Sequence, residues 1–489
     1  MSSVALVAAV ALPALAGPLI VLADRRPNLR EAITLTASGL TFLLVLSLLP
    51  AVQAGGRPAA EWVEVLPGLA LAFEVEPLGM LFGLVASGLW MVTSLYSIGY
   101  MRGHHEGEQT RFYFFFALAI TAALGVAFAR NLFTLFVFYE VLTLSTYPLV
   151  THQRTPEAMR GGRTYLGILV FTSVAFLMLA VVWTWHLAGT LEFRPGGILA
   201  GRASEGVLCG LLVLYVFGTG KAALMPFHRW LPAAMVAPTP VSALLHAVAV
   251  VKAGVFTVLK VAVYVFGIDL LRDTGIGYGL SWVAAATILL ASLVALSKDN
   301  LKARLAYSTV SQLSYIVLGA LLGNAWGVIG GGMHIVMHAF GKITLFFCAG
   351  AISVALHKTE ISDMRGIGRQ MPITMSAFLV GSLSVIGLPP FGGAWSKWYL
   401  ALGAVDAGRV ALVAVLMISS LLNVAYLMPI GVRAFFMGPS GAAAGEAGGG
   451  LREAPLLCVV PLALTAVGCL VLFFCADAVY RLLAPLGGG

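Results

Sequence analysis

Apolar runs of about 20 residues recur along almost the whole chain, with only short polar connections between them. A run of this length is long enough to cross the hydrocarbon core of a bilayer as one α-helix. Hydrophobic residues make up 60% of the 489 positions and charged residues only 10%, a composition that excludes a soluble globular protein. The sequence therefore predicts an all-α polytopic membrane protein.

The apolar runs predict about fourteen transmembrane helices, of which the seventh and the twelfth are interrupted by Pro and Gly. The expected spans are residues 3–23, 32–53, 77–100, 112–128, 131–150, 164–188, 208–231, 240–266, 279–297, 303–322, 326–356, 372–403, 408–435 and 455–482. The longest polar connection, 438–453, is rich in Gly and Ala and is typical of a flexible linker. No soluble domain is expected.

Basic residues gather in the odd-numbered connections and are sparse in the even-numbered ones. Because Lys and Arg favour cytoplasmic loops, this bias predicts cytoplasmic odd connections and both termini outside. The net charge of +8 comes from single basic residues between spans, without a run or patch, which argues against nucleic-acid binding. The five cysteines lie in apolar segments without ligand spacing and indicate neither a disulfide framework nor an iron–sulfur site.

Ionisable side chains interrupt this apolar pattern near the middle of the chain. Lys221 lies beside Pro226 and Pro232, and His246 and Lys252 follow in the next span. A charged group at membrane depth costs several kcal/mol unless it faces a partner or a polar path, so each is a candidate functional residue. Irregular backbone at this depth is tolerated where it lines a cavity or packs within protein.

A similar arrangement recurs later in the chain. Glu140 lies two spans before the interruption at Lys221, and Lys397 lies in a second Pro/Gly interruption, Gly387-Leu-Pro-Pro-Phe-Gly-Gly-Ala-Trp-Ser-Lys397. Broken helices at corresponding positions of two halves are typical of ion sites in transporters built from repeats. The alternative is that Lys397 extends to a lipid headgroup, an explanation that suits the short Glu140 side chain less well.

The eleventh span carries His334, His338 and Lys342, spaced four residues apart and therefore on one stripe of a helix. Histidines at this spacing can bind a metal, but no carboxylate lies near them, and packing histidines are a further alternative. Since His titrates near neutral pH, the stripe also suits proton transfer. With Lys221, His246 and Lys252, it predicts a polar line through the middle of the membrane.

Several ordered motifs carry a family resemblance. They are Pro238-Thr-Pro-Val-Ser-Ala-Leu-Leu-His246, Val251-Lys-Ala-Gly254, Asp299-Asn-Leu-Lys-Ala-Arg-Leu-Ala-Tyr-Ser308, His338-Ala-Phe-Gly-Lys342 and Gly387-Leu-Pro-Pro. They resemble the antiporter-like membrane subunits shared by Mrp-type cation/proton antiporters, respiratory complex I and membrane-bound hydrogenases, and the D-type subunit of the Mrp antiporters is the expected kind. Within this family, Glu76 stands where aspartate is usual and Lys260 where arginine is common.

The resemblance implies two inverted five-helix repeats, each with one broken helix and a proton half-channel. The implied units are residues 1–111 for helices one to three, 112–266 and 279–435 for the two repeats, and 455–489 for the last helix. The positions that match the family's proton relay are Glu140, Lys221, Lys252, His338 and Lys397, with His246, His334 and Lys342 along the path.

The function implied by the resemblance is proton translocation within a multisubunit antiporter for Na⁺ or another monovalent cation, in the inner (plasma) membrane. The expected partners are other membrane subunits, the lipid bilayer, protons and monovalent cations, and not nucleic acid. One alternative is a proton-pumping subunit of a redox complex, and another is a structural subunit whose charges fix assembly. No dinucleotide-binding motif is present, so we expect no cofactor and no enzymatic activity of this chain itself.

Overall fold

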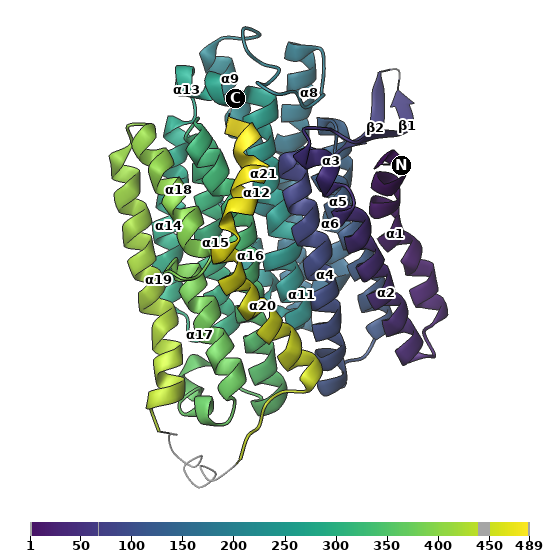
Figure 1. Ribbon diagram of the computed structural model, residues 1–489, viewed down its shortest axis with the longest axis vertical. Helices are drawn as coiled ribbons and strands as arrows, with labels where there is room; N and C mark the ends of the chain where they lie inside the picture. The colour runs from purple at the N-terminus through teal and green to yellow at the C-terminus, as the bar shows by residue number, and fades with distance from the viewer. Residues whose placement is uncertain (1, 67, 439–449, 488–489) are drawn as a thin grey trace.

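The computed structural model describes residues 2–66, 68–438 and 450–487, and helices form nearly all of the regular structure in these residues (Figure 1). Most of the helices lie side by side along the long axis of the molecule and form one bundle. Eleven helices in the described ranges are long and apolar enough to cross a membrane. The prediction of an all-α polytopic membrane protein is therefore confirmed.

Long helices match most of the expected spans. Those without interruption in the described residues are α1 (Ser2–Leu22), α2 (Pro27–Leu46), α4 (Pro77–Gly103), α5 (Gln109–Ala127), α6 (Leu132–Val150), α14 (Tyr278–Ser297), α15 (Leu301–Leu321), α16 (Ala325–Leu356), α19 (Val410–Phe436) and α20 (Leu456–Phe474). Side-chain caps start several of them, as Asn131 does for α6 and Asn324 for α16 by accepting a backbone N–H three residues ahead. Local sequence thus fixes where these helices begin.

Other spans are divided into shorter helices, and both expected interruptions are present. The divided elements are α7 (Pro156–Thr172) and α8 (Met178–Ala188), α9 (Glu205–Gly218) and α10 (Trp230–Ala233), α11 (Thr239–Ala243) and α12 (Val250–Val261), and α17 (Pro372–Ile386) and α18 (Gly393–Asp406). The short helices α3 (Leu49–Gln53), α13 (Ile268–Thr274) and α21 (Ala476–Leu483) complete the set.

The span expected over 240–266 is present, but it is not one regular α-helix. A π-helical turn over Leu244–Val248 precedes α12, another over Ala262–Phe266 follows it, and Ala249 between the first turn and α12 has a non-helical φ of −120°. π-Turns of this kind are frequent at functional sites. They leave no trace in hydropathy, because the residues in them are as apolar as their helical neighbours.

A two-stranded antiparallel hairpin, which was not predicted from the sequence, occupies the second connection. It pairs β1 (Ala59–Leu66) with β2 (Leu69–Glu74), and Ala59 lies opposite Glu74. The hairpin packs against α1 and α6 near the end of the bundle that carries the N-terminus (Figure 1).

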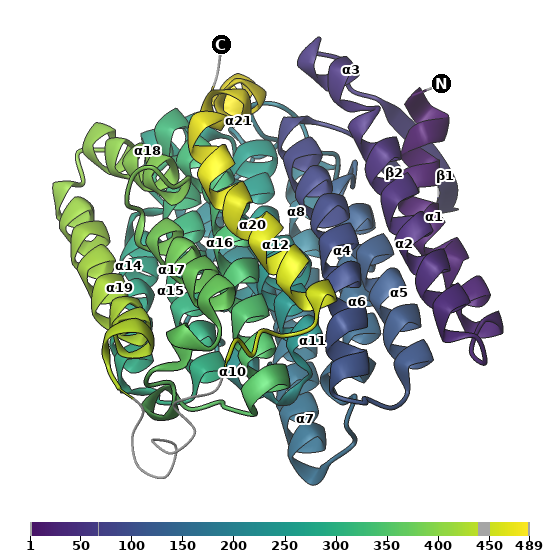
Figure 2. The ribbon, with the colours of Figure 1, turned by 60° about the horizontal axis from the view of Figure 1, so that its bottom comes forward.

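The centre of the bundle is formed by α16 and by the segment from α11 to the end of the second π-turn, Thr239–Phe266. The apolar window of that segment is fully buried, so protein surrounds it on all sides. The N-terminal helices α1 and α2 form one edge of the bundle and α19 the other (Figure 2). The ionisable residues of the central helices therefore lie inside protein and not at the lipid boundary.

Both termini lie toward one end of the bundle (Figures 1 and 2). The connections from α1 to α2 and from α4 to α5, which carry or adjoin Arg25, Arg26 and Arg102, lie toward the opposite end (Figure 1). This arrangement agrees with the alternation expected from the charge bias. The membrane side that each end faces, and the residue bounds of the two repeats, stay predictions.

Candidate functional site

The interruption between α9 and α10 brings Lys221 into the interior. Helix α9 ends at Gly218, a 3₁₀ turn spans Gly220–Ala222, and Lys221 in that turn has no exposed surface. The backbone of the turn packs closely on its neighbours: a Cβ atom at Gly220 would overlap Thr172, and one at Gly254 on α12 would overlap the backbone of Lys221. Only glycine allows these two approaches.

Neutral groups of α6 hold the Lys221 ammonium. Its Nζ donates to the Tyr139 carbonyl oxygen at 2.9 Å and to Thr143 Oγ1 at 2.6 Å, and it lies 3.2 Å from the centre of the Tyr139 ring. Glu140, the next residue on α6, interacts electrostatically with Lys221 but forms no direct ion pair with it. Glu140 Oε1 is buried without a hydrogen-bond partner. The expected pair is thus close enough to interact but not in contact.

A direct contact between two central helices joins Lys252 and His338. Lys252 Nζ on α12 lies 2.7 Å from His338 Nδ1 on α16, and both side chains are buried. When the ammonium donates this hydrogen bond, Nδ1 accepts it and the ring proton sits on Nε2. His338 Nε2 is buried and has no hydrogen-bond partner in the described residues.

The histidine stripe extends this contact toward Lys397. The rings of His334 and His338 stack with their centres 5.6 Å apart, and the ring of Tyr315 on α15 stacks with that of His334 at 5.5 Å. His334 Nδ1 lies 2.9 Å from Ser396 Oγ, one residue before Lys397. Three stacked rings from α15 and α16, with the Ser396 hydroxyl of α18, thus lie between the Lys252–His338 contact and the second interruption.

The interruption between α17 and α18 presents backbone groups to Lys397. The Lys397 Nζ donates to the Ile386 carbonyl oxygen at 2.8 Å and to Ser420 Oγ at 3.0 Å, and it lies 5.1 Å from the centre of the Tyr315 ring. The Ile386 carbonyl is available because α17 ends there, at Gly387 with its positive φ of 90°. These direct contacts show that Lys397 points into the protein and not to a lipid headgroup.

Lys342 reaches Lys397 by a second chain of hydrogen bonds. Lys342 Nζ donates to Ser308 Oγ at 2.6 Å, and Ser308 Oγ also accepts from the Tyr426 hydroxyl at 2.8 Å. Tyr426 in turn contacts the Asn423 amide. With that amide oriented to satisfy its neighbours, Asn423 Oδ1 accepts from Lys397 Nζ at 3.2 Å.

His246 is placed differently from the other path residues. It lies in the first π-turn, 4.6 Å from the Phe346 ring, and neither ring nitrogen has a hydrogen-bond partner. The charges of Lys342 and Lys252 act on it, but no hydrogen bond in the described residues joins it to them or joins Lys221 to Lys252. Hydrogen bonds and ring contacts therefore connect five residues into one network: Lys252, His338, His334, Lys342 and Lys397. No hydrogen bond in the described residues joins Glu140, Lys221 or His246 to this network.

The neutral members of the network were not predicted from the sequence; they are Ser308, Gln312, Tyr315, Ser396, Ser420, Asn423 and Tyr426. Hydroxyl and aromatic side chains are common in apolar spans and do not mark a site. The side-chain amides of Asn423 and Gln312 are less usual inside such spans and could have indicated a polar site. A buried ion pair, in which Lys260 Nζ lies 3.3 Å from Glu76 Oε1, was not predicted either. Glu76 caps α4 through two backbone N–H groups and accepts from the Tyr264 hydroxyl, so this pair fixes α4 to α12.

Comparison with known proteins places this chain in a family. The family described as "NADH:quinone oxidoreductase/Mrp antiporter, TM" matches residues 129–423. The chain is 34% identical to NADH-quinone oxidoreductase subunit N of Desulforudis audaxviator, over 83% of this chain and 82% of that protein. It is 31% identical to Hydrogenase-4 component B of Escherichia coli, over 83% of this chain and 63% of that one. The chain therefore belongs to the family of antiporter-like membrane subunits that these complexes share.

Solved structures show the same fold. The chain matches a chain of the Mrp complex from Dietzia sp. DQ12-45-1b with a TM-score of 0.87 at 22% identity, covering 99% of this chain and 97% of that one. It matches a chain of the archaeal membrane-bound sulfane sulfur reductase with a TM-score of 0.85 at 25% identity and the same coverage. Some curated relatives are longer: the chain spans about half (49%) of NAD(P)H-quinone oxidoreductase chain 5 from Synechocystis.

Proposed function

We propose that this chain translocates protons along its buried lysines and histidines as one membrane component of a larger complex. The observation that carries the proposal is the 2.7 Å contact between Lys252 and His338, because it joins two titratable groups from different central helices. Two titratable groups in such contact bind one proton more readily than two, because a second proton would place two positive charges side by side. A proton that arrives at one group therefore displaces a proton from the other.

In this proposal, Lys397 is the residue at which the proton path through the second repeat ends. It is linked to the central contact through the stack of Tyr315, His334 and His338, and to Lys342 through Ser308, Tyr426 and Asn423. Its hydrogen-bond partners are a carbonyl, a hydroxyl and the Asn423 amide, and none of them is a carboxylate. A lysine held by neutral groups can release its proton without breaking an ion pair.

Glu140 controls the occupancy of Lys221 in this proposal. Two unit charges attract by about 4 kcal/mol at ~4 Å and by about 1.7 kcal/mol at ~10 Å, for an effective dielectric constant near 20. Glu140 is not in contact with Lys221, and its Oε1 has no other partner. A small movement of Glu140 toward Lys221 would therefore strengthen the binding of a proton there, and its return would weaken it.

For the complex in which the relay works, we propose a multisubunit antiporter that exchanges protons for Na⁺ or another monovalent cation. The motifs that resemble the D-type subunit support this choice. A proton pump of a redox complex is the second candidate. It is favoured by the relatives at 34% and 31% identity, whose names are those of a quinone oxidoreductase and a hydrogenase component.

Proton movement in membrane vesicles that contain the assembled complex tests both levels of this proposal. Lys252→Ala and His338→Gln should each reduce the initial rate at least about a hundredfold, the usual scale for loss of a proton-transfer group. Lys358→Ala, at the surface beyond α16, is the matched control and should leave the rate unchanged. Unchanged transport in both relay variants, at equal abundance of the complex, would exclude the relay.

The driving reaction separates the two candidate complexes. Addition of Na⁺, Li⁺ or K⁺ without an electron donor should start proton movement if the chain belongs to an antiporter. If it belongs to a redox complex, these salts should have no effect, and proton movement should begin when NADH or hydrogen is supplied. The pH dye and vesicles are the same in both assays.

A further inference from the structure

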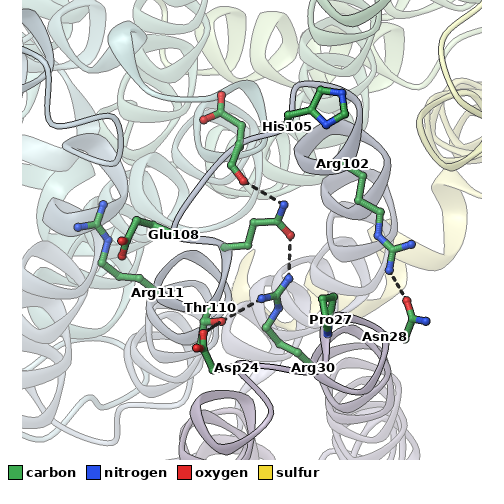
Figure 3. A pocket seen from close by; sticks show the side chains of 11 residues that line it. Asp24, Pro27, Asn28, Arg30, Arg102, His105, Glu108, Thr110 and Arg111 are labelled. Atoms are coloured by element: carbon green, nitrogen blue, oxygen red, sulfur yellow. Dashed lines mark hydrogen bonds between the residues drawn. The ribbon is translucent and has the colours of Figure 1, made fainter.

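A polar pocket of about 900 Å³ lies where the α1–α2 connection meets the α4–α5 connection, toward the end of the bundle away from the termini (Figure 3). Its volume is within the usual range of ligand sites. All of its lining residues lie between Asp24 and Arg30 or between Arg102 and Arg111. None of them belongs to the network of lysines and histidines described above, so the pocket is a separate feature of the molecule.

Two helices begin at this pocket, and neither beginning is capped by a side chain. Helix α2 starts at Pro27 and α5 at Gln109, and neither has an acidic residue in its first turn. Pro27 and Asn28 of α2 and the first three residues of α5 line the pocket. The first N–H groups of a helix have no acceptor within it, and the helix dipole adds partial positive charge there. Both helix beginnings therefore favour an anionic group in the pocket.

Arg30 lines the same pocket and is held by neutral groups only. The residue is 5% exposed, and its guanidinium group donates to Thr110 Oγ1 at 2.9 Å and to Gln109 Oε1 at 2.7 Å (Figure 3). Its Nε atom is buried without a hydrogen-bond partner, and no ion pair in the described residues includes Arg30. A buried charge is costly unless an opposite charge compensates it. The unpaired Nε of Arg30 is thus a second, independent indication of an anionic ligand.

Arg111, in the first turn of α5, supplies a second guanidinium group with a free donor. One of its terminal nitrogens donates to the His152 carbonyl oxygen at 2.7 Å, and its Nε is buried without a partner. Arg102 differs from both, because it pairs with Glu31 on α2 and donates to Asn28. Guanidinium groups bind phosphate through directed N–H bonds, so Arg30 and Arg111 suit a phosphate group.

Carboxylates also line the pocket, so its charge is mixed. Asp24 accepts from Thr110 Oγ1 at 2.5 Å, and Glu108 lies 3.9 Å from Arg154. The Glu106 carboxylate lines the pocket and accepts no hydrogen bond from the described residues. A ligand with negative charge alone would be repelled by these carboxylates. A ligand that carries a phosphate and an ammonium group matches both signs of the lining.

The helices beside the pocket have apolar outer surfaces. Only 39% of the apolar window of α1 and 33% of that of α2 and α3 is buried, and these helices form one edge of the bundle (Figure 2). Leu22 at the end of α1 and Leu29 near the start of α2 are exposed next to the lining residues. Lipid headgroups lie at the depth where transmembrane helices end. A phospholipid with its chains along α1 and α2 can therefore place its headgroup in the pocket.

We propose that this pocket binds the phosphoethanolamine headgroup of a phospholipid. The phosphate is held by Arg30, Arg111 and the N-terminus of α5, and the ammonium group is held by the carboxylates, above all by Glu106. The bound headgroup links the start of α2 to the α4–α5 connection and so stabilises this edge of the bundle. The site is independent of the proposed proton translocation, because it shares no residue with the proton path.

Lipid binding to the purified full-length chain in detergent, after removal of bound lipid, tests the site. Phosphatidylethanolamine should remain bound in native mass spectrometry and raise the Tm. Phosphatidylglycerol with the same acyl chains lacks the ammonium group and should bind at least about tenfold more weakly, the scale of one lost hydrogen bond to a charged group. Equal binding of the two lipids would overturn the zwitterionic site. Free phosphoethanolamine at the same concentration should leave the Tm unchanged, and an equal rise would overturn the lipid as its source.

Variants of the lining residues separate headgroup binding from a general effect on folding. Arg30→Gln and Arg111→Gln should each weaken binding of phosphatidylethanolamine at least about tenfold. Glu106→Gln should weaken it similarly without weakening binding of phosphatidylglycerol, a difference that a damaged fold would not produce. The matched control is Arg25→Gln, because Arg25 is exposed on the same connection and does not line the pocket. Binding as tight in Arg111→Gln and Glu106→Gln as in Arg25→Gln would overturn the proposal.

Discussion

The two lysines at helix interruptions have different electrical surroundings. Lys221 lies within the field of Glu140, whereas Lys397 has only the Ile386 carbonyl, the Ser420 hydroxyl and the Asn423 amide around its Nζ. A proton on Lys221 is therefore controlled by a nearby charge. In the proposed relay, neutral dipoles alone would hold a proton on Lys397, which suits a site where the proton leaves.

If Lys397 carries the proton, the variants Lys397→Ala and Lys397→Arg should both lose proton transport. Lys397→Ala removes the proton carrier, and Lys397→Arg keeps a positive charge that does not leave at physiological pH. Both should lower the initial rate of proton movement about a hundredfold or more, as expected for loss of a proton-transfer group. The assay is the vesicle assay above with equal amounts of assembled complex. Full activity of the alanine variant would show that Lys397 has only a structural role.

A double-variant cycle tests the interaction between Glu140 and Lys221. Glu140→Ala removes the field that acts on Lys221, and Lys221→Ala removes the group on which it acts, so each should reduce initial rates strongly. The double variant should be no worse than either single variant, because residues that act as a unit are not additive. Two partial losses that multiply in the double variant would show that the residues act independently.

The sequence predicts the charged stations of this site but not the groups between them. Lys252, His338 and Lys397 stand out because ionisable groups are costly in apolar spans. Tyr315 and Ser420 do not, since aromatic and hydroxyl side chains are ordinary in transmembrane helices. The sequence also could not show that Glu140 and Lys221 stay out of contact, because this depends on how α6 packs against the turn at Lys221.

At the scale of helices, the site depends on how closely α12 approaches the turn that carries Lys221. Gly254 on α12 faces this turn, and Gly218 and Gly220 let the turn itself approach Leu177 and Thr172. The pattern of apolar runs, read together with the Pro and Gly residues within them, predicted the interruptions at Pro226 and at Gly387. It did not predict the π-turns on either side of α12, or the β1–β2 hairpin, since neither changes the length of an apolar run.

Gly254→Ala should destabilise the protein and reduce transport. The added Cβ would overlap Lys221 and Ala222, and overpacking of this kind costs about 1–3 kcal/mol. The matched control is Gly210→Ala on α9, where a Cβ meets nothing within 4 Å and the change favours the helix by about 1 kcal/mol. Thermal unfolding in detergent should give a lower Tm for Gly254→Ala and an equal or higher Tm for Gly210→Ala. Equal Tm values for Gly254→Ala and the native chain would contradict the close approach.

At the scale of the whole molecule, the contacts that join Lys252, His338, His334 and Lys397 run from the two central helices to the interruption between α17 and α18. The central segment Thr239–Phe266 is buried along its whole apolar window, whereas only 33% of the corresponding window of α2 and α3 is buried. The proposed proton path therefore lies in a part of the bundle that protein encloses. The outer helices are the surfaces left for lipid or for other subunits.

This arrangement predicts that the isolated chain moves protons poorly and exchanges no Na⁺. A site for a hard cation needs several oxygen ligands, and the relay consists of lysines, histidines and neutral groups with Glu140 as its carboxylate. In the described residues, no group of three or more His, Cys, Asp or Glu side chains is placed to hold a metal ion. The cation path therefore has to involve partner subunits if the complex is an antiporter.

Reconstitution of the purified chain into vesicles with an internal pH dye checks this expectation. Addition of Na⁺ should give no more proton movement than Lys252→Ala vesicles show, while vesicles with the assembled complex should respond at once. The comparison with Lys252→Ala is needed because any leak of the bilayer is common to both preparations. Robust Na⁺-driven proton movement by the native chain alone would show that the cation passes through this protein, and that its own residues complete the exchange.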